Sequence, residues 1–171
     1  MAELLCIVGE DDILIGPGER ERVHCSDMWH RGVHILLSRP DGRMLLQMRG
    51  KDRDKYPSHY DLSVSEHVNF EESYEEAAVR GLKEELGIEA PLVEIAHFRM
   101  NYGPADNMVA RLYTAVYGGE IEAASSETAS LHYLTEAEIS RMLEADPDAF
   151  APWTREILKH CLGMDNNLIM Y

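Results

Sequence analysis

The sequence predicts an α/β domain in which an amphipathic helix packs against a sheet of short strands. Residues 74–86 have apolar side chains at helical spacing, so one face is apolar and the other is charged. Before and after this segment, short apolar runs read as strands. At 171 residues, the chain has the length of one domain with a sizeable core. The predicted apolar face consists of Tyr74, Ala78, Val79, Leu82 and Leu86.

Two hairpins are predicted before the helix. Residues 1–20, with LLCIV and ILIG on either side of two aspartates, predict a small added hairpin. Residues 23–50 predict two strands joined at Asp41-Gly42, a dipeptide that is favoured in tight turns. Residues 51–68 predict a loop that continues into a strand. The helix should therefore follow directly after a strand end.

Strands and then helices are predicted after residue 88. Residues 92–103 and 107–119 predict two strands, and helices are expected near Thr135–Glu144 and Trp153–Leu162. Pro152 suits a first helical turn, where its missing N–H costs no hydrogen bond. The apolar end, LIMY, could dock on the body or on a second copy in a homodimer. We expect it to fray, as chain ends commonly do.

The net charge of −15 limits the possible ligands. Binding of a nucleic-acid duplex is not expected, because phosphate backbones need neutralising lysines and arginines. An anionic diphosphate would need local positive charge from a metal ion or from basic side chains. The candidates for such substrate contacts are Arg49, Lys51, Arg53 and Lys55 in one loop, and Arg111 on a strand. A solvated basic loop is the alternative interpretation.

The cysteines and the apolar runs indicate a compartment. Cys6, Cys25 and Cys161 have no paired spacing, as expected of unbridged thiols in a reducing environment. No signal segment and no apolar stretch of bilayer length is evident. We therefore expect a soluble, cytoplasmic protein that does not associate with a membrane.

Two adjacent glutamates, Glu84 and Glu85, lie at the border of the predicted apolar face. Like charges at a half-buried position are costly unless a cation compensates them. Carboxylate oxygens suit Mg²⁺ or Mn²⁺ better than Zn²⁺. The alternative is a solvated charge cluster in which Arg80 forms an i, i+4 ion pair with Glu84. The spacing of the longer segment favours the metal site.

Residues 66–88 resemble the Nudix box, which is a glycine, five residues, a glutamate, seven residues and then Arg-Glu-apolar-x-Glu-Glu-x-Gly-apolar. The matching positions are Glu72, Arg80, Leu82, Glu84, Glu85, Gly87 and Ile88. Two positions differ, because Glu66 replaces the opening glycine and Gly81 replaces the first helix glutamate. A glycine inside a helix costs about 1 kcal/mol relative to alanine. Gly81 could admit substrate or make room for Glu66.

The resemblance extends over about residues 20–145 and implies both fold and roles. It implies one Nudix domain over 1–171, an α/β/α sandwich with a mixed central sheet, in which 1–20 form an added hairpin and 146–171 a C-terminal helix and tail. It also implies that Glu84 and Glu85 bind the catalytic metal, that Arg80 orients a carboxylate, and that Glu72 supports the loop or a second metal.

Within the superfamily, the chain resembles type 1 isopentenyl-diphosphate isomerases and the hydrolases related to them. His24, His30 and His67 fall where this branch has histidines, which bind a metal in the isomerase. Each histidine could instead be structural. The isomerase also uses a cysteine acid, where this chain has Ser65, and a later glutamate, where it has residues 106–108. A hydroxyl lacks the tunable acidity of a thiol, so hydrolysis is expected over isomerisation.

Three functions stay open. The favoured one is Mg²⁺- or Mn²⁺-dependent hydrolysis of a nucleoside diphosphate or another X-linked diphosphate. The others are isopentenyl-diphosphate isomerisation and a non-catalytic Nudix module that binds a ligand. For hydrolysis, the base could be Glu127, Glu72 or Glu66; Glu127 is favoured because SETASLHYL resembles a Nudix segment in which a loop glutamate often has this role. Gly81→Glu should increase hydrolysis if the box has merely lost a ligand.

Overall fold

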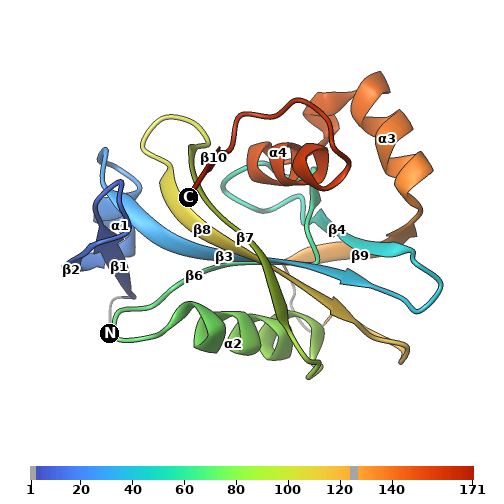
Figure 1. The fold of residues 1–171 in the computed structure, drawn as a ribbon, viewed down its shortest axis with the longest axis horizontal. Helices are drawn as coiled ribbons and strands as arrows, with labels where there is room; N and C mark the ends of the chain where they lie inside the picture. Colours follow the sequence, from blue (N-terminus) through green and yellow to red (C-terminus); the bar gives the residue numbers. More distant parts are fainter. Residues whose placement is uncertain (1–2, 124–126) are drawn as a thin grey trace.

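The computed structural model describes residues 3–123 and 127–171 and forms a three-layer sandwich (Figure 1). The green helix α2 (Tyr74–Leu86) covers one face of a mixed sheet, and the orange and red helices α3 (Glu136–Ala145) and α4 (Pro152–Cys161) cover the other. The predicted α/β/α sandwich is therefore confirmed. None of the described helices is long and apolar enough to cross a membrane.

The remaining elements follow the predicted order along the chain. The short helices are α1 (Arg20–Val23) and η1 (Pro147–Ala149). The strands are β1 (Leu4–Val8), β2 (Leu14–Glu19), β3 (Trp29–Ser38), β4 (Met44–Arg49), β5 (Tyr60–Asp61), β6 (Val64–His67), β7 (Val93–Asn101), β8 (Asn107–Val116), β9 (Thr128–Leu134) and β10 (Ile169–Met170).

The long strand β3 organises the sheet. It pairs in parallel with β8 along its whole length and antiparallel with β1, β4 and β6. The strand order is β10-β7-β8-β3-β1-β2, and β4 also pairs with β5 and β9. The expected turn between β3 and β4 is present, with Gly42 at φ 87°, where glycine is favoured. Because β6 pairs with β3, the segment 66–88 that resembles the Nudix box begins at the centre of the sheet.

Local sequence signals define both ends of α2. The Ser73 and Glu76 side chains each bond to the other residue's backbone N–H in a capping box, and Gly87 ends the helix at φ 66°. The helix buries Tyr74, Ala77, Ala78, Gly81, Leu82 and Leu86. Val79 is 48% exposed, so its predicted place on the buried face was wrong. The buried face is centred closer to Gly81, and Val79 falls beyond its edge.

Two hydrophobic cores lie on opposite faces of the sheet. Alternation along β3 sends Val33, Ile35 and Leu37 to the α2 side and Leu36 to the side of α3 and α4. The α2 core also includes Tyr113, and the other core includes Phe98, Phe150 and Ile157. This alternation decides which polar side chains of each strand can meet.

Both chain ends join the sheet. The predicted N-terminal hairpin is present as β1 and β2, and β1 also pairs with β3. The C-terminus does not fray as expected, because Ile169 and Met170 pair with Arg99 and Phe98 of β7. The Tyr171 ring stacks on His97 with centroids 4.3 Å apart. Backbone pairing at an open sheet edge accounts for the difference.

Candidate functional site

The short strand β6 supplies functional side chains to both faces of the sheet. Ser65 lies by His34, on the side of α4, and His67 lies by His24 and His30. Val64 belongs to the α2 core, and Glu66 approaches Gly81 of α2. Successive side chains of a strand point to opposite faces. Adjacent residues of one segment therefore serve two different clusters.

Three histidines, which we call the histidine cluster, meet on the first of these faces. One potential ligand atom from each of His24, His30 and His67 lies within 4.8 Å of the others. The Nε2 atoms of His24 and His67 are 3.1 Å apart. A carboxylate also lies next to the cluster, since Asp106 Oδ1 is 4.0 Å from His24 Nδ1. The structure thus brings together the three histidines that the resemblance picked out.

Burial keeps the histidine cluster uncharged. It lowers the pKa of His30 to about 3 and that of His67 well below its usual value, and the neighbouring histidines lower both further. The pKa of His24 is also lowered, by burial and by Lys55. Neither ring nitrogen of the fully buried His30 has a hydrogen-bond partner of ordinary geometry among the described residues. A neutral imidazole without such a partner, as at His30, is suited to bind a metal ion.

Two carboxyl groups, which we call the carboxyl pair, meet on the α2 side. They belong to Glu66 of β6 and Glu85 of α2, and the two carboxyl groups lie close enough to affect each other's pKa. The Gln47 side chain holds Glu85 in place by donating to its Oε2 over 2.7 Å. Glu85 is half-buried between strands and helix. Its predicted half-buried position is confirmed, whereas the same prediction for Glu84 was wrong, because the Glu84 side chain is 60% exposed.

The carboxyl pair retains protons more strongly than ordinary glutamates. Burial raises the pKa of Glu66, against the opposing effect of Arg80. Burial also raises the pKa of Glu85 well above its usual range, and the nearby charge of Glu66 adds to this. A bound cation would compensate the negative charge of the ionised pair.

Arg80 connects the box loop to the helix. Its Nε and Nη2 atoms donate to the two carboxylate oxygens of Glu72 over 2.8 and 3.1 Å, and Nη2 also donates to the His67 carbonyl. Glu72 in turn accepts from the Asn69 backbone N–H. Arg80 Nη1 lies 3.2 Å from Glu84 Oε2. The i, i+4 ion pair is therefore present, and Glu84, 60% exposed, lies outside the carboxyl pair.

Ser65 is part of a buried hydrogen-bond network centred on Asp61. Its hydroxyl donates to Asp61 Oδ1 over 3.0 Å and lies 3.1 Å from His34 Nδ1. The same oxygen accepts from Trp153 Nε1 and Thr154 Oγ1, at 2.7 and 3.0 Å. Burial lowers the pKa of His34 to about 4, so His34 is neutral near pH 7. The position expected for a cysteine acid thus has a hydroxyl tied to a carboxylate.

The predicted basic loop is only partly available to a substrate. Arg49 forms a buried ion pair with Asp61 at 2.6 Å, and Arg53 pairs with Glu127. Lys55 Nζ lies 3.6 Å from Asp106 Oδ2, next to the histidine cluster. Lys51 is exposed. The loop therefore extends from Glu127 to the histidine cluster.

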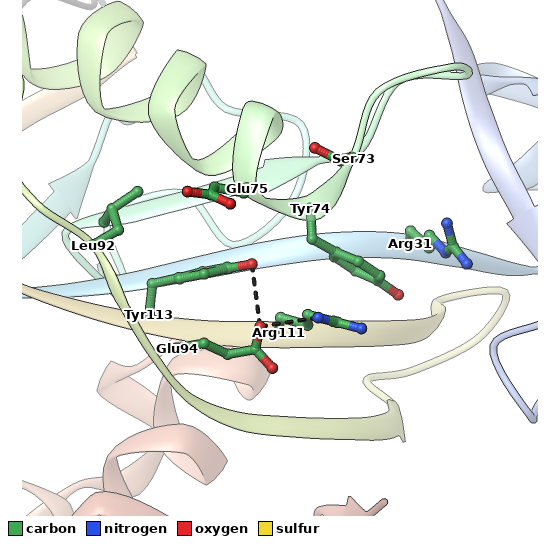
Figure 2. Close-up of a pocket in the computed structure, with 8 residues that line it drawn as sticks. All are labelled: Arg31, Ser73, Tyr74, Glu75, Leu92, Glu94, Arg111 and Tyr113. Carbon is green, nitrogen blue, oxygen red and sulfur yellow. Dashed lines mark hydrogen bonds and ion pairs between the residues drawn. The ribbon is translucent and has the colours of Figure 1, made fainter.

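Arg111 lies apart from these basic residues, in a hollow at the start of α2 (Figure 2). The hollow has a volume of about 450 Å³, and Arg31, Tyr74, Leu92 and Tyr113 contribute to its lining. Arg111 donates to Glu94 over 2.9 Å, and its guanidinium lies 4.6 Å from the Tyr74 ring centroid. The five predicted substrate contacts therefore do not form one surface.

Two residues of the site carried no recognisable sequence signal. Asp61 and Gln47 lie on β5 and β4, in segments that otherwise read as ordinary strands or loops. Both are buried and are recognisable only by their partners, Ser65 and Glu85 respectively. A buried polar residue within a strand is the one feature that could have drawn attention to them.

Comparisons with known proteins agree with this architecture. The family profile described as NUDIX domain matches residues 28–161. An isopentenyl-diphosphate Delta-isomerase of Nocardia farcinica is 34% identical over 137 residues, which cover 76% of this chain and 77% of that protein. A prenyl-diphosphate phosphatase of Methanosarcina mazei is 31% identical over 160 residues, covering 87% and 89% of the two chains.

A solved structure has the same fold over nearly the whole chain. A protein of Deinococcus radiodurans superposes with a TM-score of 0.81 at 22% identity and covers 93% of this chain and 99% of its own. At this identity the likeness concerns the fold alone. Together with the family match, it confirms the predicted sandwich. The predicted relationship to type 1 isopentenyl-diphosphate isomerases is confirmed by the Nocardia farcinica relative.

Proposed function

This chain belongs to the Nudix family, and we propose that it is a metal-dependent hydrolase that cleaves a diphosphate linkage in a small organic diphosphate. The observation that carries the proposal is the state of Ser65. Ser65 lies two residues before His67 on the same face of β6, and its hydroxyl is bonded to Asp61 and lies next to a neutral His34. No thiol is available there to protonate a double bond, whereas carboxylates and imidazoles that suit metal ions are present.

The residues proposed to hold divalent metal ions fall into two groups. Glu84, Glu85 and Glu72 would serve Mg²⁺ or Mn²⁺ at the box, and the histidine cluster would serve a second ion. Unpartnered, uncharged nitrogens at His30 support the second site. Bound metal would neutralise the diphosphate and acidify a water molecule. The specific ion at each group is part of the proposal.

The remaining roles belong to side chains around these groups. Lys55, beside Asp106 and His24, is placed to contact a diphosphate near the histidine cluster. We assign the general base to Glu127, since the next residue, Thr128, bonds to Gln47, which holds Glu85. Arg53 pairs with Glu127 and would orient its carboxylate.

A prenyl diphosphate is the first substrate class to examine. The phosphatase of Methanosarcina mazei and the isomerase of Nocardia farcinica each carry a prenyl-type diphosphate or its isopentenyl unit in their names. Near Ser65, the Phe98 and Tyr102 rings each lie 6.3 Å from the His34 ring, and the Trp153 ring lies 6.0 Å from that of Tyr102, so these side chains form an aromatic group. Such a group suits an isoprenoid chain better than a polar sugar.

Isomerisation of isopentenyl diphosphate is the second candidate, because the histidine cluster and the Nocardia farcinica relative favour it. Conversion of isopentenyl diphosphate to its allylic isomer, or deuterium exchange into it, would show this activity. Either result would replace the hydrolase proposal.

The test is phosphate release from a panel of prenyl diphosphates, isopentenyl diphosphate, nucleoside diphosphates, nucleotide sugars and dinucleoside polyphosphates. Each is assayed with Mg²⁺, with Mn²⁺ and with chelator. We expect metal-dependent release, with prenyl diphosphates cleaved best. Tight binding of a panel member without release would instead indicate a non-catalytic Nudix module.

A further inference from the structure

The two departures from the Nudix box face each other across the contact between α2 and β6. A Cβ atom built on Gly81 would lie 3.0 Å from Glu66 Cγ and 2.8 Å from Val64 Cγ1. Both distances are shorter than the optimal separation of about 3.5–4.0 Å for carbon atoms. Val64 is fully buried in the α2 core. A side chain at position 81 would therefore displace Val64, Glu66 or the helix.

The same geometry decides between two interpretations of Gly81. A glycine that admits substrate would leave open space above its Cα atom. Here that space is filled by the side chains of Val64 and Glu66. Gly81 therefore makes room for a residue of the chain itself.

The Glu66 side chain uses this room to reach the functional groups of the box. Its carboxylate lies 3.5 Å from Arg80 Nη1 and close enough to Glu85 for each group to affect the pKa of the other. Its side chain is 23% exposed, against 60% for Glu84. Glu66, from the strand, is therefore the less exposed of the two glutamates that neighbour Glu85.

We propose that Glu66 is a metal ligand together with Glu85, taking the place of the helix glutamate that is absent at position 81. This inference rests on the metal-dependent function proposed above. The box then keeps the same number of carboxylates, because Glu66 on strand β6 replaces the glutamate that is absent from position 81 of the helix. The mutual fit of Glu66 and Gly81 explains why both departures occur in one chain.

Binding of Mn²⁺, followed by electron paramagnetic resonance, tests the role of Glu66. The relevant signal is the bound Mn²⁺ that excess Mg²⁺ displaces, because imidazole ligands favour transition metals over Mg²⁺. Glu66→Gln keeps the side-chain shape and should weaken this binding at least about tenfold. Glu75→Gln removes the same charge from an exposed position of α2 and should leave the binding within about twofold.

Exchanging the two residues tests their coupling. Glu66→Gly and Gly81→Glu should each weaken Mg²⁺-displaceable Mn²⁺ binding at least about tenfold. The double variant, with glutamate at 81 and glycine at 66, should bind at least about tenfold better than Glu66→Gly alone. If circular dichroism shows that the double variant is not folded, Val64→Ala is added to it, because this change removes the second close contact of position 81. The triple variant then takes the place of the double variant in the comparison.

The outcomes separate this inference from the proposed function. Wild-type binding that Glu66→Gln leaves unchanged, with phosphate release intact, overturns the role of Glu66 and leaves the hydrolase standing. Loss of binding in Glu66→Gln together with recovery in the exchanged variant supports the role, even if no panel member is hydrolysed. A wild-type protein that binds no Mn²⁺ overturns both proposals.

Discussion

The two faces of β6 have different potential metal ligands. On the α4 side, His67 joins two other imidazoles, and burial lowers their pKa values. On the α2 side, Glu66 joins Glu85, and burial raises their pKa values. Removal from water favours the uncharged form in both cases, so the shifts run in opposite directions. One four-residue strand thus separates a nitrogen cluster from an oxygen cluster.

The difference between the faces shows what each would require of a cation. The imidazoles are already deprotonated near pH 7 and would bind a metal without releasing protons. At the carboxyl pair, a bound cation would favour the ionised carboxylates, against the raised pKa values. Imidazoles suit transition metals, and carboxylates suit Mg²⁺ and Mn²⁺. Variants on the two faces should therefore have separable effects.

The largest effect is expected from Glu85→Gln. It should lower kcat/KM for metal-dependent phosphate release at least about 100-fold, because a ligand charge is removed while the shape is kept. The raised pKa means that ionising Glu85 opposes folding as the pH rises above its unfolded value. The metal-free variant should therefore be at least as stable as wild type to urea at pH 7.

Glu75→Gln is the matched control, since it removes one exposed glutamate from the same helix. Unchanged turnover in Glu85→Gln would remove Glu85 from the proposed metal site. A large loss in both variants would point to the charge of the whole helix instead of one ligand.

His67→Gln tests the independence of the two faces. It should weaken binding of Co²⁺, seen in its visible absorption spectrum, about 10- to 100-fold. The Mg²⁺-displaceable Mn²⁺ signal should stay within about twofold, because His67 and Glu66 lie on opposite faces. If both signals fall together, the clusters act as one site and the separation drawn here is wrong.

Gly81→Ala should destabilise the fold despite the better helix propensity of alanine. The contacts of 2.8 and 3.0 Å predict an overpacking cost of about 1–3 kcal/mol, which outweighs a gain of about 1 kcal/mol. For the same reason, Gly81→Glu should not increase hydrolysis as the sequence alone suggested. Urea unfolding measures the effect on stability, with exposed Lys83→Ala as the control near zero. A stabilised Gly81→Ala variant would contradict the close packing.

The smallest effect concerns pH and His34. Its pKa of about 4 lies below the unfolded value of about 6.5, so protonation of the unfolded chain lowers stability as the pH falls through 6.5. His34 should account for about 0.5–1 kcal/mol of lost stability between pH 7 and pH 6. Urea unfolding at both pH values should show a correspondingly shallower dependence in His34→Gln. An unchanged dependence would mean that His34 titrates equally in both states.

Regular elements were predictable because they depend on local patterns. The helical period of 74–86, the Asp41-Gly42 turn and the proline at the start of α4 all act within a few residues. Val79 was misplaced because the helix packs with its buried face centred near Gly81, which the sequence pattern does not reveal. The docking of the C-terminus was missed because it depends on a free edge of β7, which is distant in sequence.

The candidate site was predictable to the extent that spacing along one segment defines it. Glu72, Arg80, Glu84 and Glu85 could be found in this way, as could the three histidines by resemblance. Asp61 and Gln47 could not, because their significance lies in hydrogen bonds to residues on other strands. Arg111 was grouped with the basic loop, but the pleat of β8 sends it to the α2 side.

The sequence by itself determined the family, the fold class and the residue types of the box, because periodicity and spacing are properties of the chain. Only the tertiary structure decided which of these residues meet. The packing of α2 on β6 places Glu66 over Gly81 and beside Glu85, and it leaves Glu84 exposed. Such contacts depend on the register and crossing of distant elements, which no local pattern specifies.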